Sequence, residues 1–221
     1  MNNIPVYISP GGTATLILRE IPHKQTAYIL LRTVLTGKLP ELIEDCVSVC
    51  REFGAEHCYL SAEDPSVIPS LPHAYDILLL RVQKDRLPPP ASPMELVPMS
   101  PANERIYQRI YNRCFREVSH ALTYEKDQLE RIRREGQQAF LSLAPDGTPC
   151  GMGELHGNEL AAVGLLPEYR GRGKDLTLSL LAHCPGPEIT VTVVSDNEKA
   201  LGLYDTLGFT VTGKESNWYK A

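Results

Sequence analysis

The segment 170–175, with the sequence RGRGKD, combines two glycines with three cations and begins three residues after an apolar run that ends at Pro167. Glycine lets a backbone turn tightly and approach a ligand closely. If a helix begins here, its first N–H groups have no partner within the helix and lie at the positive end of the helix dipole. The segment therefore predicts an anion-binding turn that suits a phosphate group.

The spacing of the segment excludes two common phosphate loops. A Walker-type loop needs a serine or threonine after Gly-Lys to hold magnesium, whereas Asp175 follows Lys174 here. A dinucleotide-binding fingerprint needs a third glycine two residues further on, which is also missing. The pattern that fits is Arg/Gln-x-x-Gly-x-Gly/Ala after a strand, and it resembles the coenzyme A loop of the GNAT superfamily of N-acetyltransferases.

A second motif follows at a suitable distance. Residues 188–194 (EITVTVV) are rich in β-branched residues and alternate isoleucine or valine with threonine as a strand does, and polar residues 195–197 then favour the start of a helix. The string Asn-x-x-Ala-x-x-Leu-Tyr-x-x-x-Gly-Phe runs from Asn197 to Phe209 and is similar to another hallmark of that superfamily. The resemblance covers about residues 94–221 and implies an α/β fold with a mixed sheet.

The resemblance implies roles for individual residues in binding acetyl-CoA, the cosubstrate of the family. Tyr204 corresponds to the tyrosine that donates a proton to the departing thiolate, and a phenol holds its proton at neutral pH. Asn197 is expected to cap its helix and to contact the coenzyme. The remaining coenzyme-binding residues are expected to be the strand end, which pairs with the pantetheine arm, and the loop, which binds the pyrophosphate: Val163, Gly164, Leu165, Arg170, Gly171, Arg172, Gly173, Lys174 and Asp175.

The general base is less clearly marked than the acid. Glu159 lies eleven residues before Arg170, at the start of the central strand, where some family members place a glutamate that removes the amine proton through water. A carboxylate needs burial to become a useful base at neutral pH. Glu154 and His156, on the preceding strand, are alternatives to Glu159.

Asp175 departs from the family pattern, which usually has glycine or alanine at this position. A carboxylate ~6 Å from a phosphate charge costs about 2–3 kcal/mol at an effective dielectric constant of about 20. This cost predicts weakened coenzyme binding, which an Asp175→Gly substitution should strengthen. The aspartate could instead point away from the phosphate while its charge favours the start of the helix.

Composition limits the possible partners. The chain has 221 residues and a net charge of -5, and its positive charge is local to the loop, which argues against nucleic-acid binding. No long apolar run or N-terminal signal pattern predicts a membrane segment, so a cytoplasmic location is expected. The six cysteines form no Cys-x-x-Cys pair, and we expect reduced thiols and no metal site.

A proline-rich linker at residues 87–93 (LPPPASP) is the clearest boundary in the chain. Before it, residues 1–86 predict strands at 13–19, 26–34, 56–61 and 75–82 and a helix at 41–53, which resembles a degenerate half of the GNAT fold. No glycine-rich phosphate loop survives there. After it, residues 94–221 predict the catalytic domain, with strands at 94–99, 140–143, 149–156 and 159–166 and helices at 102–117 and 124–136.

The predicted function is an acetyl-CoA-dependent N-acetyltransferase that transfers an acetyl group to a primary amine by direct attack in a ternary complex. The acceptor is a small-molecule or peptide amine, and the protein is a monomer or a homodimer. The alternative is a catalytically silent module of the same fold that binds coenzyme A or another protein. Tyr107, Tyr111, His120 and Tyr124 either line the acceptor cleft or pack in the core.

Overall fold

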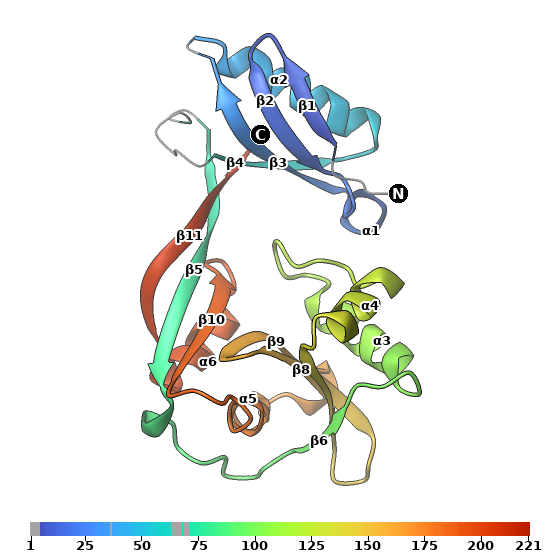
Figure 1. Cartoon of the computed structure of the whole chain (residues 1–221), viewed down its shortest axis with the longest axis vertical. Helices are drawn as coiled ribbons and strands as arrows, with labels where there is room; N and C mark the ends of the chain where they lie inside the picture. Colours follow the sequence, from blue (N-terminus) through green and yellow to red (C-terminus); the bar gives the residue numbers. More distant parts are fainter. Residues whose placement is uncertain (1–4, 36, 63–67, 69–70) are drawn as a thin grey trace. The chain divides into compact units, whose positions relative to one another are not determined.

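The computed structural model describes residues 5–35, 37–62, 68 and 71–221 (Figure 1). The chain divides into two compact units, here called unit 1 (residues 1–77 and 214–221) and unit 2 (residues 78–213). Two long strands, β5 (His73–Gln83) and β11 (Thr210–Lys220), contribute residues to both units. Both units combine helices with a sheet, as predicted. The domain limits at 1–86 and 94–221 stay a prediction.

Unit 1 is a sheet with one long helix. Its elements are β1 (Val6–Ser9), β2 (Gly12–Ile17), α1 (Ile21–Lys24), β3 (Thr26–Val34), α2 (Leu39–Glu52) and β4 (His57–Ala62). The strand order is β1-β2-β3-β4-β11, and β3 runs parallel to β4. The sequence predicted β2, β3, α2, β4 and β5, whereas it did not predict β1 or α1.

The core of unit 1 explains the local cysteine cluster. Leu42, Cys46 and Cys50 on α2 are fully buried and pack with Ile29 of β3 and Leu16 of β2. The alternating burial of β2 shows that one face of this sheet lies against the helix. The six cysteines are not paired in disulfides; five are buried and Cys114 is half-buried.

Unit 2 holds the two motifs. Its elements are η2 (Lys84–Arg86), β6 (Glu95–Pro98), α3 (Glu104–Phe115), α4 (Lys126–Arg134), β7 (Gln138–Leu143), β8 (Pro149–His156), β9 (Glu159–Leu165), η3 (Pro167–Tyr169), α5 (Gly173–Leu181), β10 (Glu188–Val194) and α6 (Glu198–Thr206). The strand order is β11-β5-β10-β9-β8-β7-β6. Neighbours from β6 to β9 are antiparallel, and β9 is parallel to β10.

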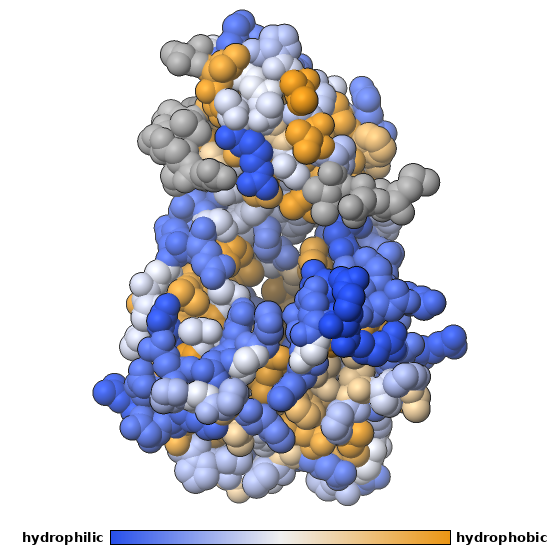
Figure 2. Space-filling view, in the orientation of Figure 1, coloured by the Kyte–Doolittle hydropathy of each residue, from blue (hydrophilic) through white to orange (hydrophobic). Residues whose placement is uncertain are grey.

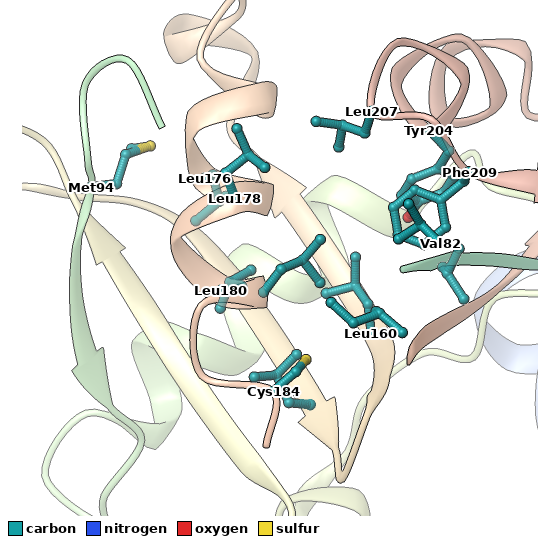
Figure 3. Close-up of a cluster of buried hydrophobic side chains, with 14 of the residues drawn as sticks. Val82, Met94, Leu160, Leu176, Leu178, Leu180, Cys184, Tyr204, Leu207 and Phe209 are labelled. Atoms are coloured by element: carbon teal, nitrogen blue, oxygen red, sulfur yellow. The ribbon is translucent and has the colours of Figure 1, made fainter. Parts of the chain in front are cut away.

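Helix α5 follows the glycine-rich loop and is buried along most of its length. Leu176, Leu178 and Leu180 belong to the same apolar cluster as Tyr204 and Phe209 (Figure 3). Glycines on β8 allow the helix to approach the sheet this closely, because a Cβ added to Gly153 would lie 2.2 Å from Leu180 Cδ1. The position of the loop therefore depends on tight packing between α5 and β8.

Helices α3 and α4 cover a second core in unit 2. Tyr107, Tyr111 and Tyr124 are all buried there, so these tyrosines pack rather than line a cleft. The outer face of α4 is strongly charged, and Figure 2 shows a hydrophilic surface over this helix at the right of the view. Among the described residues, no helix is long and apolar enough to cross a membrane.

Candidate functional site

The central feature of the site is the separation of β9 from β10. These parallel strands share one register pair, Thr190 with Glu159, at the start of both strands. The register between β8 and β9 shifts at Glu154 and Leu155, which marks a bulge in the middle of β9. Beyond that pair the two strands no longer form a ladder, so an opening is left at their carboxyl ends.

A cavity of about 600 Å³ lies at this opening, entirely within unit 2. Its walls come from the end of β9, the start of α6 and the end of α3 with the segment that follows it. The lining residues are Cys114, Phe115, Glu117, Val118, Ser119, Val163, Gly164, Leu165, Arg170, Asp196, Asn197, Glu198, Lys199, Ala200, Leu203 and Tyr204. Six predicted site residues therefore meet around one cavity: the strand end, Arg170, Asn197 and Tyr204.

The glycine-rich loop has the backbone form that an anion site requires. Gly171 has a φ of +96°, a left-handed conformation that favours glycine. Helix α5 begins at Gly173, and its N-cap residue, Arg172, makes no side-chain capping bond. The N–H groups of the first turn are thus not capped by that side chain, and N–H groups at a helix start suit an anion.

The charged side chains of the loop point to different partners. Arg172 Nη2 donates to the carbonyl oxygen and to Oγ of Ser92, both at 3.0 Å. The Ser92 N–H donates to Asp175 Oδ1 at 3.1 Å. These two side chains therefore hold the end of the proline-rich segment, whereas Arg170 lines the cavity and Lys174 is exposed.

The hydrogen bond between Asp175 and Ser92 changes the expected effect of Asp175 on the affinity for acetyl-CoA. Because its carboxylate accepts a hydrogen bond from Ser92, we expect Asp175→Asn, which keeps an acceptor oxygen, to change the Kd for acetyl-CoA by less than about threefold. Asp175→Ala should lower the Tm by about 2–4 °C, because it removes a bond worth about 1 kcal/mol. Calorimetric titration and thermal melts test both. A tenfold gain in affinity for Asp175→Asn would instead support the charge repulsion expected from the sequence.

Tyr204 and Asn197 occupy neighbouring parts of the cavity wall. Asn197 caps α6 by accepting a hydrogen bond from the Ala200 N–H at 3.2 Å, which confirms its predicted capping role. Tyr204 is 5% exposed, and burial raises its pKa above the ordinary value. No hydrogen bond of its hydroxyl is found among the described residues, which leaves the group available to a ligand in the cavity.

Glu159 lies away from the other predicted residues. It is half-buried at the start of β9, opposite His156, and about four residues or ~13 Å of strand separate it from Val163. It does not line the cavity, and its role as a base stays a prediction. The carboxylates that line the cavity belong to Glu117, Asp196 and Glu198, which no motif in the sequence marks.

Glu154, the alternative base, is enclosed in the core beside the site. It is 3% exposed and accepts hydrogen bonds from the hydroxyls of Tyr107 at 2.5 Å and Tyr124 at 2.9 Å. Burial raises the pKa of this carboxyl, although the two hydroxyls act in the opposite direction. Glu154 is paired with Ala162, next to the strand end, but it does not reach the cavity. The other alternative, His156, is exposed at the end of β8.

The described residues of unit 1 show no opening like that in unit 2. Strands β3 and β4, which connect through α2 as β9 and β10 connect through α5, pair continuously from Thr26 and His57 to Leu31 and Ala62. A continuous ladder leaves no gap for a ligand arm between the strands. The cation before α2, Lys38, forms an ion pair with Glu41.

No group of three or more histidine, cysteine or acidic side chains within the described residues is arranged to hold a metal ion.

Two comparisons with known proteins match parts of this chain. Residues 105–209 match the model of the acetyltransferase (GNAT) family. A relative, the peptidyl-lysine N-acetyltransferase YjaB of Escherichia coli (strain K12), is 38% identical over 66 residues, which are 30% of this chain and 45% of that protein. The chain thus spans less than half the length of that relative.

Solved structures resemble the whole chain in fold. A GCN5-related N-acetyltransferase from Sphaerobacter thermophilus has a TM-score of 0.60 at 15% identity, covering 96% of this chain and 76% of that one. A tandem GNAT protein from the clavulanic acid biosynthesis pathway has a TM-score of 0.59 at 17% identity, covering 98% and 81%. A GCN5-related N-acetyltransferase from Kribbella flavida has a TM-score of 0.59 at 14% identity, covering 99% and 89%.

Proposed function

This chain belongs to the GNAT superfamily of N-acetyltransferases, and we propose that it transfers an acetyl group from acetyl-CoA to a primary amine by direct attack in a ternary complex. The observation that carries this proposal is the cavity between the diverging ends of β9 and β10. Arg170, the first residue of the glycine-rich loop, and Tyr204 both line this cavity, and α5 begins three residues after Arg170. A thioester of coenzyme A needs both features, an anion site and a proton donor.

The residues have distinct roles in this proposal. The N–H groups at the start of α5 and the Arg170 guanidinium bind the pyrophosphate, and residues 163–165 pair with the pantetheine arm. The neutral amine nitrogen attacks the thioester carbonyl carbon, the C–S bond breaks, and Tyr204 gives its proton to the thiolate and regains one from the attacking nitrogen. The three cavity carboxylates attract a cationic amine and accept its proton through water, whereas Glu159 needs a longer chain of waters for the same task.

We further propose that unit 1 binds no coenzyme and acts as a partial, non-catalytic GNAT-like subdomain. The paired β3 and β4 strands and the Lys38–Glu41 ion pair support this view. The likeness of the whole chain to a tandem GNAT protein is consistent with it.

The two arginines of the loop give a matched test of the coenzyme site. Arg170→Ala should raise the Kd for acetyl-CoA about fivefold at low salt, because an exposed charge pair at ~4 Å is worth about 1 kcal/mol in water. Arg172→Ala should change it by less than twofold, since that side chain is held by Ser92. Titration at two ionic strengths measures both, and high salt should reduce the Arg170 effect. An Arg172 effect that equals or exceeds the Arg170 effect would contradict this assignment.

The activity itself is tested with the full chain, acetyl-CoA and a panel of amines. The panel includes a lysine-containing peptide, because the similar YjaB protein is named a peptidyl-lysine N-acetyltransferase. Release of free thiol, followed by mass spectrometry of the amine, reports transfer. Binding of acetyl-CoA without transfer to any amine would favour the silent coenzyme-binding module instead.

A further inference from the structure

We propose that Cys114 limits the length of the acyl group that the enzyme transfers, because its side chain closes the cavity beside the strand end at Gly164. This inference rests on the proposed function. It concerns the donor thioester, and it assigns a specificity-determining role to a residue at the end of α3.

The contact between α3 and β9 leaves no spare space at this point. A Cβ added to Gly164 would lie 2.8 Å from Cys114 Cβ, 3.1 Å from Cys114 Sγ and 3.4 Å from Phe115 Cε2. Distances below 3.4 Å are shorter than ordinary van der Waals contacts between carbon atoms. Cys114 and Phe115 both line the cavity, so together they form its wall next to the strand end.

The direction of the coenzyme brings the acyl group to this wall. The pyrophosphate is proposed to lie at residues 170–175, and the arm then runs back along the strand from Leu165 toward Val163. The thioester at the end of the arm therefore lies near Gly164, which Cys114 contacts. Each carbon atom added to the acetyl group would extend toward the space that the Cys114 side chain occupies.

The wall is held by a stack of aromatic rings behind it. The Phe115 ring centroid lies 4.5 Å from that of Tyr111, which lies 3.5 Å from that of Tyr124. Tyr124 is fixed in turn by Asn112, which accepts from its N–H at 2.7 Å, and by its hydroxyl bond to Glu154. Close-packed interiors resist small displacements, so the wall cannot yield easily to a longer acyl chain.

The thiol itself fills space and does not react. Burial raises the pKa of Cys114 to about 11, so the group is a neutral thiol near pH 7. The thiolate is the nucleophilic form, and it is therefore scarce beside the thioester. The size of the side chain, and not its chemistry, should decide which donor is accepted.

The test compares propionyl-CoA with acetyl-CoA as donors for the full chain. Cys114→Ala should raise the ratio of their kcat/KM values about tenfold, because a pocket change of about one methylene has at least this effect. Cys114→Val adds bulk at the same position and should lower the ratio below that of the wild type. Cys184→Ala, at a buried cysteine outside the cavity, is the matched control and should leave the ratio unchanged. The ratio of the two Kd values is measured alongside by calorimetry.

The outcomes separate this inference from the proposed function. Acetyl transfer with an unchanged donor ratio in Cys114→Ala would overturn the inference and leave the function intact. An increased ratio in Cys114→Val or Cys184→Ala would also overturn it. If no amine is acetylated, the Kd ratio decides: a shift toward propionyl-CoA in Cys114→Ala supports the inference although the function fails. If the wild-type chain binds neither acetyl-CoA nor propionyl-CoA, both the inference and the proposed function are overturned.

Discussion

Tyr204→Phe should lower kcat for acetyl transfer about a hundredfold while the Kd for acetyl-CoA stays within about twofold. The phenylalanine ring keeps the packing against Phe209, whose ring centroid is 5.4 Å away, so only the hydroxyl is lost. Because burial raises the pKa of Tyr204, the wild-type phenol keeps its proton throughout the neutral range. Steady-state kinetics from pH 6 to 9 and calorimetric titration measure the two quantities.

A second tyrosine provides the control for this change. Tyr169 is half-buried in η3 and does not line the cavity, so Tyr169→Phe should change kcat by less than about twofold. If Tyr204 only packs in the core, its phenylalanine variant should behave like the Tyr169 variant. A threefold or smaller loss of kcat would remove Tyr204 as the proton donor and leave the coenzyme site unaffected.

Gly153→Ala should destabilise the protein by about 2–3 kcal/mol, the upper part of the range for an overpacked core. The new Cβ would lie 2.2 Å and 2.6 Å from the two terminal carbons of Leu180, which is fully buried on α5 (Figure 3). The helix must then move from the sheet or the leucine must leave its rotamer. We expect the Tm to fall by about 5–10 °C, and the affinity for acetyl-CoA to fall because α5 carries the loop.

The matched control is Gly202→Ala on α6. A Cβ there has no atom within 4 Å, and alanine is favoured over glycine inside a helix by about 1 kcal/mol. Its Tm should stay equal to or rise above that of the wild type. Equal Tm values for Gly153→Ala and the wild type would show that Leu180 yields without cost and that α5 is less tightly constrained than its packing indicates.

Several local features could be predicted from residues close together in the chain. The limits of β3 and β10 agree with the predicted segments 26–34 and 188–194, because β-branched residues mark both. The Asn197 cap and the glycine turn that precedes α5 also depend on short-range rules of helix starts and glycine turns. The polar strand β11 carries no such signal, and pairing with other strands is what makes it a strand.

The partners of the charged and aromatic side chains could not be predicted in this way. The hydrogen bonds of Ser92 with Arg172 and Asp175 join residues about 80 positions apart. Because of these bonds, both side chains already have a partner within the protein. Glu154 is enclosed by two tyrosines from other elements, whereas Glu159 ends up at the closed end of the strand pair.

The sequence by itself predicted the resemblance to the superfamily, the glycine-rich turn before α5 and the helix that carries Tyr204, because each depends on residue types at fixed short spacings. Only the tertiary structure decided where β9 and β10 separate, which carboxylates line the cavity and that Cys114 closes one wall of it. These features depend on long-range packing between α3, α5 and the sheet, where a missing side chain such as that of Gly164 or Gly153 sets how closely two elements approach. A local sequence pattern does not determine how closely two such elements pack.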